Sequence, residues 1–254
     1  MCASGAAALR TDDLAVWYRG LRAVDGVSLT VPRGQVRAII GPNGAGKTTF
    51  FNAVSGFVPK TRGRVLLFDD DVTGDPAHRL VLRRLVRAFQ VPSIFPRLSV
   101  LDNVRLGALL RSGRTPSMLY QHHRDRLTAA EAREVLARVG LEKEADVLAG
   151  MLSHGDAKRL DLAIALATRP AVLLLDEPTA GMSEQETRRT VKLMRELASE
   201  FTLVFTEHDM RVVFSIAEHI TVLHQGRIIA DGAPADVSRD PGVRSAYLGE
   251  EPVA

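Results

Sequence analysis

The chain has 254 residues, of which 46% are hydrophobic and 25% are charged, and these proportions are typical of a soluble globular protein of one domain with a possible subdomain. Its net charge of +3 does not by itself indicate a nucleic-acid partner, and none is predicted. The single cysteine, Cys2, excludes an internal disulfide framework and a cysteine-based zinc site. Because no stretch reaches the roughly 20 apolar residues of a membrane span, we expect any action at a membrane to require a partner.

The first part of the chain is predicted to form β-strands. Residues 14–18 and 24–31 predict two short strands, and residues 35–40 predict a third after a Pro-Arg-Gly turn. Alternation along a strand puts Trp17 and Tyr18 on opposite faces, so only one of these rings can line a nucleotide pocket.

The residues that follow the third strand match the phosphate-binding pattern G-x-x-x-x-G-K-[ST]. They are Gly41, Pro42, Asn43, Gly44, Ala45, Gly46, Lys47, Thr48 and Thr49. Glycines let successive backbone N–H groups turn toward phosphate oxygens, and a predicted helix at 49–55 presents its positive N-terminal end to them. Lys47 adds a charge for the β- and γ-phosphates, and the Thr48 hydroxyl can ligate Mg²⁺. The loop therefore predicts a nucleotide site between a strand and a helix.

After the phosphate loop, the predicted structure changes from strands to mainly helices. Residues 63–68 predict another strand, and the acidic run at 69–71 predicts an exposed turn. Residues 89–152 are predicted to be mainly helical, with periodic segments at 100–110 and 129–139. Four basic residues fall at helical spacing and are interpreted as one solvated helix face: Arg79, Arg83, Arg84 and Arg87.

After residue 152, helices and strands alternate. The predicted helices are 156–167, 184–199 and 210–217, and the predicted strands are 172–175, 203–206, 220–223 and 227–230. This alternation predicts an α/β fold with a mostly parallel sheet, in which ligands bind at the carboxyl ends of the strands.

Two of these strands end in polar side chains that suit a phosphate site. Asp176 and Glu177 end one buried strand, as expected for a Mg²⁺-binding carboxylate followed by a general base that activates water. Glu207, His208 and Asp209 follow the next strand, at the edge where the nucleotide is expected. The sequence therefore predicts a nucleotide and Mg²⁺ as ligands.

Taken together, these motifs resemble the nucleotide-binding subunits of ABC transporters, which belong to the P-loop NTPases. The resemblance rests on the phosphate loop, Gln90 after an apolar strand, the Leu-Ser-His-Gly-Asp stretch at 152–156, the pair Asp176 and Glu177, and His208. It implies one ABC-type domain over residues 1–254. Its parts would be a core with an antiparallel β subdomain at about 10–88 and 153–240, a helical subdomain at about 89–152 and a tail at 241–254.

The resemblance also implies a role for each matching residue. Tyr18 would stack on adenine, and Gln90 would sense the γ-phosphate and Mg²⁺ while coupling to a membrane subunit. His208 would hold the γ-phosphate and the attacking water, so that the implied catalytic set is Glu177, His208, Gln90 and Lys47. Thr48, Gln90 and Asp176 would form the Mg²⁺ site. In a head-to-tail dimer, Ser153 and Gly155 would contact the ATP that the partner subunit binds.

Three positions depart from the usual family pattern. His154 and Asp156 replace a glycine and a glutamine of the usual Leu-Ser-Gly-Gly-Gln stretch, and Ser183 stands where many members have aspartate. Asp156 lies in the first turn of a predicted helix, where a carboxylate favours the helix dipole and can form a capping arrangement with Ser153. Whether this carboxylate also lies close to the partner's phosphates stays open.

Several shorter stretches resemble one branch of the family, the ATPases of high-affinity branched-chain amino acid importers. They lie at residues 51–57, 152–155, 180–183, 207–210 and 246–250. The resemblance implies an ATPase at the cytoplasmic face of the inner membrane, paired with a second ATPase in a homo- or heterodimer. It also implies permease subunits and, indirectly, a periplasmic solute-binding protein.

Three other readings remain as alternatives to branched-chain import. Urea and short-amide importer ATPases share the Leu-Ser-His-Gly stretch and are the closest rival. Lipopolysaccharide-export ATPases share the Tyr-Leu-Gly-Glu tail, but they would be expected to keep glycine at position 154. A soluble ABC ATPase of translation or DNA repair would be expected to carry two cassettes or a long coiled coil, and this chain has neither pattern.

Overall fold

The computed structural model describes residues 6–88, 92–111 and 126–248, except the side chains of residues 126, 127, 247 and 248. Gln90, a predicted catalytic and Mg²⁺-binding residue, lies outside the described residues.

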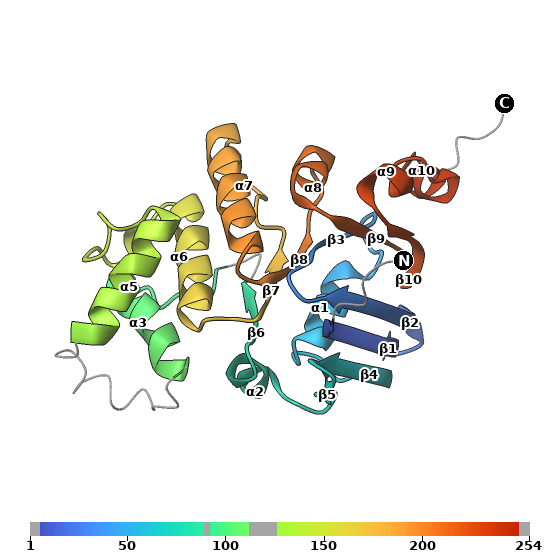
Figure 1. Cartoon of the computed structure of the whole chain (residues 1–254), viewed down its shortest axis with the longest axis horizontal. Helices are drawn as coiled ribbons and strands as arrows, with labels where there is room; N and C mark the ends of the chain where they lie inside the picture. Colours follow the sequence, from blue (N-terminus) through green and yellow to red (C-terminus); the bar gives the residue numbers. More distant parts are fainter. Residues whose placement is uncertain (1–5, 89–91, 112–125, 249–254) are drawn as a thin grey trace.

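The strands among the described residues form two sheets (Figure 1). The antiparallel sheet has the strand order β2-β1-β4-β5 and contains β1 (Ala7–Tyr18), β2 (Leu21–Pro32), β4 (Arg62–Leu67) and β5 (Asp70–Asp71). The second sheet has the order β10-β9-β3-β8-β7-β6. Its strands are β3 (Val36–Ile40), β6 (Leu85–Ala88), β7 (Val172–Asp176), β8 (Thr202–Thr206), β9 (His219–His224) and β10 (Arg227–Gly232). In this sheet all pairs are parallel except β9 with β10, so the predicted α/β fold with a mostly parallel sheet is confirmed.

The first strand is longer than the sequence predicts. It begins at Ala7 rather than at residue 14, because the backbone of its first half pairs with β2 on one side and with β4 on the other. These pairings join residues far apart in the chain, so a local pattern does not indicate them.

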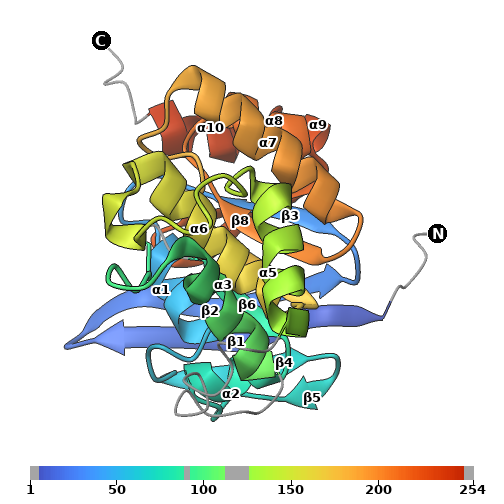
Figure 2. The same cartoon turned by 90° about the vertical axis from the view of Figure 1, so that its left-hand side faces the viewer.

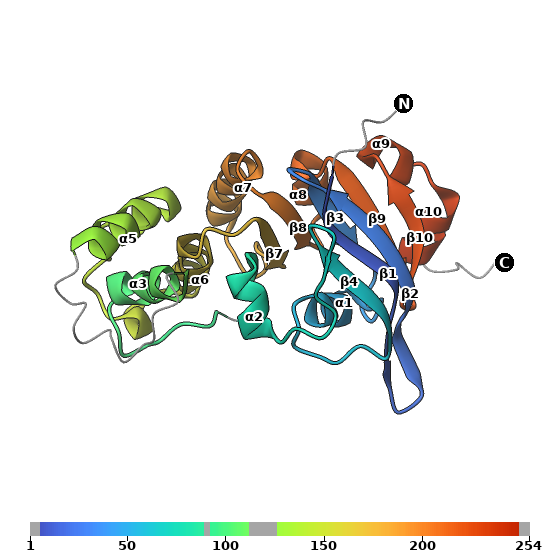
Figure 3. The same ribbon diagram turned by 60° about the horizontal axis from the view of Figure 1, so that its bottom comes forward.

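The helices lie in three places. Helix α1 (Lys47–Val54) packs against β1, β2 and β7, and α2 (Ala77–Leu82) contacts β6. Helices α3 (Val100–Arg111), α5 (Arg126–Val139) and α6 (His154–Ala167) pack against one another, with the short helix η2 (Ala149–Met151) before α6. The remaining described helices are α7 (Glu184–Ala198), α8 (Met210–Ile216), α9 (Pro234–Val237) and α10 (Pro241–Leu248). Figure 2 shows α3, α5 and α6 in front of the sheets, and Figure 3 shows them at the opposite end of the molecule from β10.

In the part of the chain that the structure describes, buried side chains form one cluster on each face of the parallel sheet, and β3 contributes to both. Ala38 and Ile40 belong to the cluster that α6, α7 and α8 cover. Ile39, between them in sequence, belongs to the cluster that includes Phe50 and Phe51 of α1 and the antiparallel sheet. Because successive side chains of a strand point to opposite faces, β3 is buried on both faces, and α1 lies between the two sheets.

The interpretation of four arginines as one helix face is wrong for two of them. Helix α2 ends at Leu82, and Arg84 has a φ of 69°, which turns the chain into strand β6. Arg87 then lies within β6, and only 5% of its side chain is exposed. Among the described residues, no helix has the length and apolar character that a membrane crossing requires. The subdomain boundaries at residues 89 and 152 stay a prediction.

Candidate functional site

The phosphate loop joins the end of β3 to the start of α1, as the sequence predicts. Every residue of β3 is buried, so the strand fixes the position at which Gly41 begins the loop. A Cβ atom at Gly41 would overlap the carbonyl oxygen of Leu223, and one at Gly46 would overlap that of Ala23. Gly46 also has a φ of 103°. Glycine is therefore required at both positions, by close backbone approach and, at Gly46, by conformation.

The Lys47 side chain lies along this loop. Its Nζ atom donates hydrogen bonds to the carbonyl oxygens of Gly41 at 2.6 Å and Pro42 at 3.1 Å. Burial lowers the pKa of Lys47 below its ordinary value, while the negative charges of Glu177 and Asp176 oppose this shift. The ammonium group thus lies between the loop and two carboxylates.

Asp176 ends strand β7 directly beside Thr206, which ends strand β8. The two residues are partners in the parallel pairing of these strands. The Thr206 hydroxyl donates to Oδ1 of Asp176 at 2.7 Å, and the Arg87 guanidinium contacts Oδ2 at 2.6 Å. Only 3% of the Asp176 residue is exposed. Among the described residues, one donor therefore holds each oxygen of its carboxylate.

Glu177 and His208 form a pair at the same sheet edge. Glu177 has a φ of 49°, and its backbone N–H donates to the Thr206 hydroxyl at 3.1 Å. Its Oε1 atom lies 2.8 Å from Nε2 of His208. The backbone N–H of His208 donates to the buried Glu207 carboxylate at 3.0 Å, and this carboxylate also accepts from Thr179. Both sides of the pair are thus anchored to the strand ends.

A cleft of about 650 Å³ brings most of the predicted site together. Its lining residues are Tyr18, Leu21, Arg22, Ala23, Asn43, Gly44, Ala45, Gly46, Lys47, Thr48, Thr49, Glu177, His208 and Gln225. Tyr18 is 45% exposed, whereas the ring of Trp17 lies 5.1 Å from the guanidinium carbon of Arg22. The volume lies within the range of small-molecule sites, roughly 300–1,000 Å³.

Ser153 and Gly155 do not line this cleft; they lie at the start of α6. The Ser153 hydroxyl caps this helix by accepting the backbone N–H of Asp156 at 3.1 Å, and it donates to the Asp156 carboxylate at 2.7 Å. The predicted capping arrangement of these two residues is thus present. Asp156 also forms an ion pair with Arg159, which donates to the carbonyl of Gly140 at the end of α5. A Cβ atom at Gly155 would overlap the carboxylate of Glu186.

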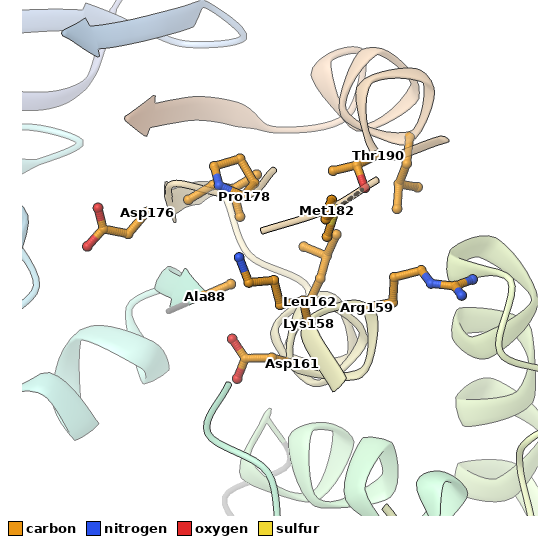
Figure 4. Close-up of a pocket in the computed structure, with 11 residues that line it drawn as sticks. Ala88, Lys158, Arg159, Asp161, Leu162, Asp176, Pro178, Met182 and Thr190 are labelled. Carbon is orange, nitrogen blue, oxygen red and sulfur yellow. Dashed lines mark hydrogen bonds between the residues drawn. The ribbon is translucent and has the colours of Figure 1, made fainter. Parts of the chain in front are cut away.

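Behind Asp176 lies a second, narrower pocket between α6 and the segment that follows β7 (Figure 4). Lys158 reaches from α6 into this space and donates to the carbonyl oxygen of Ala180 at 2.6 Å. Burial lowers the pKa of Lys158 below its ordinary value. Most other side chains around it are apolar, among them Leu162, Pro178 and Met182. Lys158 therefore ties α6 to the loop after Glu177.

The sequence analysis missed the contacts that support the site. Arg87, Lys158 and Thr206 hold site residues or the loop beside them, and Glu207 was noted only as a polar neighbour of His208. One signal was available for Arg87, which is the charged residue of the otherwise apolar strand β6. Lys158 gave no such signal, because Asp156, Arg159 and Asp161 lie close to it in α6. Thr206 gave no such signal, because a threonine at a strand end is ordinary.

Comparison with known proteins identifies the class. The family described as "ABC transporter" matches residues 24–180, more than half of the chain, and the family described as "Branched-chain amino acid ATP-binding cassette transporter" matches residues 227–253. A crystal structure of a nucleotide-free ATP-binding cassette from an ABC transporter is 31% identical, with a TM-score of 0.83 and coverage of 96% of this chain and 100% of that one. The chain therefore belongs to the ABC transporter family, binds nucleotide and is an ABC-type ATPase.

Several individual proteins are similar to the chain over nearly their whole length. The high-affinity branched-chain amino acid transport ATP-binding proteins BraF of Pseudomonas aeruginosa and LivG of Escherichia coli are 39% and 37% identical to the chain. Each alignment covers 95% of this chain and 98% of the relative. The lipopolysaccharide export system ATP-binding protein LptB of Escherichia coli is 36% identical, with coverage of 96% and 98%. A dimeric structure of another ATP-binding cassette in a post-hydrolysis state, with ADP and Pi, is 25% identical, with a TM-score of 0.76 and coverage of 89% and 98%.

Proposed function

We propose that the chain is the ATP-hydrolysing motor subunit of an importer for branched-chain amino acids. The observation that carries the solute class is the match of residues 227–253 to the branched-chain family, together with the names of the relatives BraF and LivG. The solute itself would contact other subunits, so no residue of this chain is expected to select it.

We assign each part of ATP to particular residues that line the cleft. Tyr18 would stack on the adenine, and the backbone N–H groups of residues 43–49 would bind the phosphates, helped by the positive N-terminus of α1. The Lys47 ammonium would exchange its carbonyl partners in the loop for oxygens of the β- and γ-phosphates, which are stronger acceptors for a cation.

Hydrolysis requires a base near the γ-phosphate, and we assign this role to Glu177. Its carboxylate would accept the proton of the attacking water, while His208 holds the carboxylate in position and contacts the γ-phosphate. For His208 to donate to the carboxylate, its proton must be on Nε2. Gln90 is proposed from sequence alone as the third residue around this water.

The predicted metal site fits Mg²⁺ in its chemistry. Mg²⁺ prefers oxygen ligands and commonly takes one or two carboxylates together with substrate phosphates. Thr48 supplies a hydroxyl in the cleft, and Asp176 supplies a carboxylate with lone pairs to spare after its two hydrogen-bond donors. When bound, the ion would neutralise charge on the β- and γ-phosphates. Gln90 would complete this proposed set.

We infer that two such subunits close head to tail, so that Ser153 and Gly155 of one meet the ATP of the other. The start of α6 supports this inference, because free backbone N–H groups at a helix N-terminus attract anions. The assembly would lie at the cytoplasmic face of the inner membrane, where ATP-driven closure is passed to permease subunits. A periplasmic solute-binding protein would deliver the amino acid, and the second ATPase is either an identical or a related chain.

Uptake measurements test the solute class. In cells of the source organism, Lys47→Ala should abolish uptake of labelled leucine and leave uptake of labelled urea unchanged, because the charge that stabilises the γ-phosphate is lost. Lys192→Ala, at a lysine whose side chain is 82% exposed, serves as the control and should change neither. Intact leucine uptake with failed urea uptake would assign the chain to the urea branch. No change in either would contradict import and leave lipopolysaccharide export as the function to test.

A further inference from the structure

Arg87 is a buried charge that the proposed reaction does not use. It lies in the parallel sheet on strand β6, three residues before Gln90 in the sequence, and only 5% of its side chain is exposed. It is not among the residues that line the nucleotide cleft. A buried guanidinium requires partners that compensate for its lost hydration, so its contacts indicate what it holds in place.

Those contacts join two elements of the site. One terminal nitrogen of Arg87 lies 2.6 Å from Oδ2 of Asp176 at the end of β7. The other donates to the side-chain oxygen of Asn52 at 2.6 Å and to the Ser55 hydroxyl at 3.4 Å, in and just after helix α1. The guanidinium carbon also lies 5.7 Å from the ring centre of Phe51. The rigid fork of the guanidinium thus spans from α1 to the carboxylate.

This arrangement matters for the metal site because its two described ligands come from those same two elements. Thr48 lies in the first turn of α1, and Asp176 ends β7. A rotation of the Asp176 carboxylate or a shift of α1 would change the distance between these ligands. Arg87 contacts both elements at once. Of the roughly four lone-pair sites of the carboxylate, the described residues occupy two, one through Arg87 and one through Thr206.

We propose that Arg87 is a positioning residue for the metal site, which fixes the Asp176 carboxylate relative to helix α1 before Mg²⁺-nucleotide binds. The inference rests on the proposed assignment of Thr48 and Asp176 as Mg²⁺ ligands. It assigns to Arg87 no contact with nucleotide, so its effect is confined to binding that depends on the metal.

The test compares nucleotide affinity with and without the metal. The affinity of the purified full-length chain for a fluorescent ADP analogue is measured in EDTA and in saturating Mg²⁺, and the ratio gives the gain due to the metal. Arg87→Met should reduce this gain by about tenfold or more, the usual effect of removing a partner of a metal ligand, and leave the EDTA affinity close to that of the wild type. Arg87→Lys should also lose most of the gain, because a single ammonium group cannot span both partners.

Three further variants separate positioning from a general loss of stability. Arg37→Met removes another buried arginine of the same sheet, paired with Asp231 at 2.6 Å, and should leave the metal-dependent gain unchanged. Asn52→Ala keeps the ion pair but removes the anchor on α1, so it should reduce the gain in the same direction and remains informative if Arg87→Met does not fold. In an Asp176→Asn background, Arg87→Met should have no additional effect on the gain.

The possible results distinguish the role of Arg87 from the proposed Mg²⁺ site on which it rests. If the wild type shows no metal-dependent gain, the proposed Mg²⁺ site itself is wrong. If the wild type shows the gain and Arg87→Met keeps it, or if Arg37→Met loses it equally, Arg87 is an ordinary structural ion pair and the inference is overturned.

Discussion

Glu177 and His208 both line the proposed nucleotide cleft and contact each other at 2.8 Å, although 31 positions separate them in the chain. The backbone of each is fixed by a hydrogen bond, from Glu177 to Thr206 and from His208 to Glu207. Because the backbones are anchored, a side-chain substitution can remove the chemistry without moving the strands. Single substitutions can therefore test the proposed roles of Glu177 and His208 separately.

Glu177→Gln removes the proposed base and keeps the size of the side chain. We expect ATP hydrolysis to fall by roughly 10²- to 10⁴-fold, the usual contribution of general-base catalysis, while ATP still binds. Turnover and the affinity for ATP are measured on the same preparation. Glu184→Gln, at a glutamate with 79% of its side chain exposed, is the control. Normal turnover in Glu177→Gln would show that another group takes the proton.

At the scale of elements, the parallel sheet assembles the site by ending several strands at one edge. Strand β3 leads into the phosphate loop, β7 ends at Asp176, and β8 ends at Thr206. The register pairs Thr206 with Asp176 on one side and with Ile39 on the other. Thr206 is thus the central residue of this edge, and its hydroxyl bonds both Asp176 and the backbone of Glu177.

Thr206→Val replaces this hydroxyl by a methyl group of similar size. We expect the free energy of unfolding to fall by about 1–3 kcal/mol, because a buried carboxylate oxygen loses its donor. Urea denaturation followed by circular dichroism measures the change. Thr206→Ser keeps the hydroxyl and should retain most of the stability that Thr206→Val loses. Equal stability of the two variants would mean that the hydroxyl contributes little to the sheet edge.

At the scale of the molecule, Ser153 and Gly155 at the start of α6 are not among the residues that line the cleft of the phosphate loop. Ser153 caps α6 and Ser183 caps α7, each by accepting a backbone N–H of the first turn, and Ser183 also forms a capping box with Glu186. Neither cap needs a ligand for its own stability. In the proposed dimer, Ser153 would instead contact the ATP that the second subunit binds.

The two caps allow a matched test of dimer closure. In the Glu177→Gln protein, ATP should produce a dimer that light scattering detects. Adding Ser153→Asp should abolish it, because aspartate is also a good N-cap but places a negative charge against the partner's phosphates. Ser183→Asp makes the same change at α7 and should leave the dimer intact. If Ser153→Asp also dimerises, the proposed contact is wrong; if Glu177→Gln alone does not, a different ATPase chain must be the partner.

The sequence by itself determined the class of fold and indicated the residues to which the proposed chemistry is assigned. The phosphate loop is a continuous stretch, and Asp176, Glu177 and His208 follow apolar strands, so local patterns were sufficient to indicate them. The alternation of strands and helices similarly predicted the parallel sheet, because each element carries its own periodicity.

Only the tertiary structure decided which side chains support those residues. Arg87 is 89 positions from Asp176 and Thr206 is 30 positions from it, and no local pattern encodes such contacts. The helical spacing of the arginines wrongly placed Arg87 on a solvated helix face. The helix ends before Arg84, and the chain then turns into strand β6, which contains Arg87. Burial and strand register depend on the whole chain, and they place Arg87 against Asp176, the proposed metal ligand, rather than at the surface.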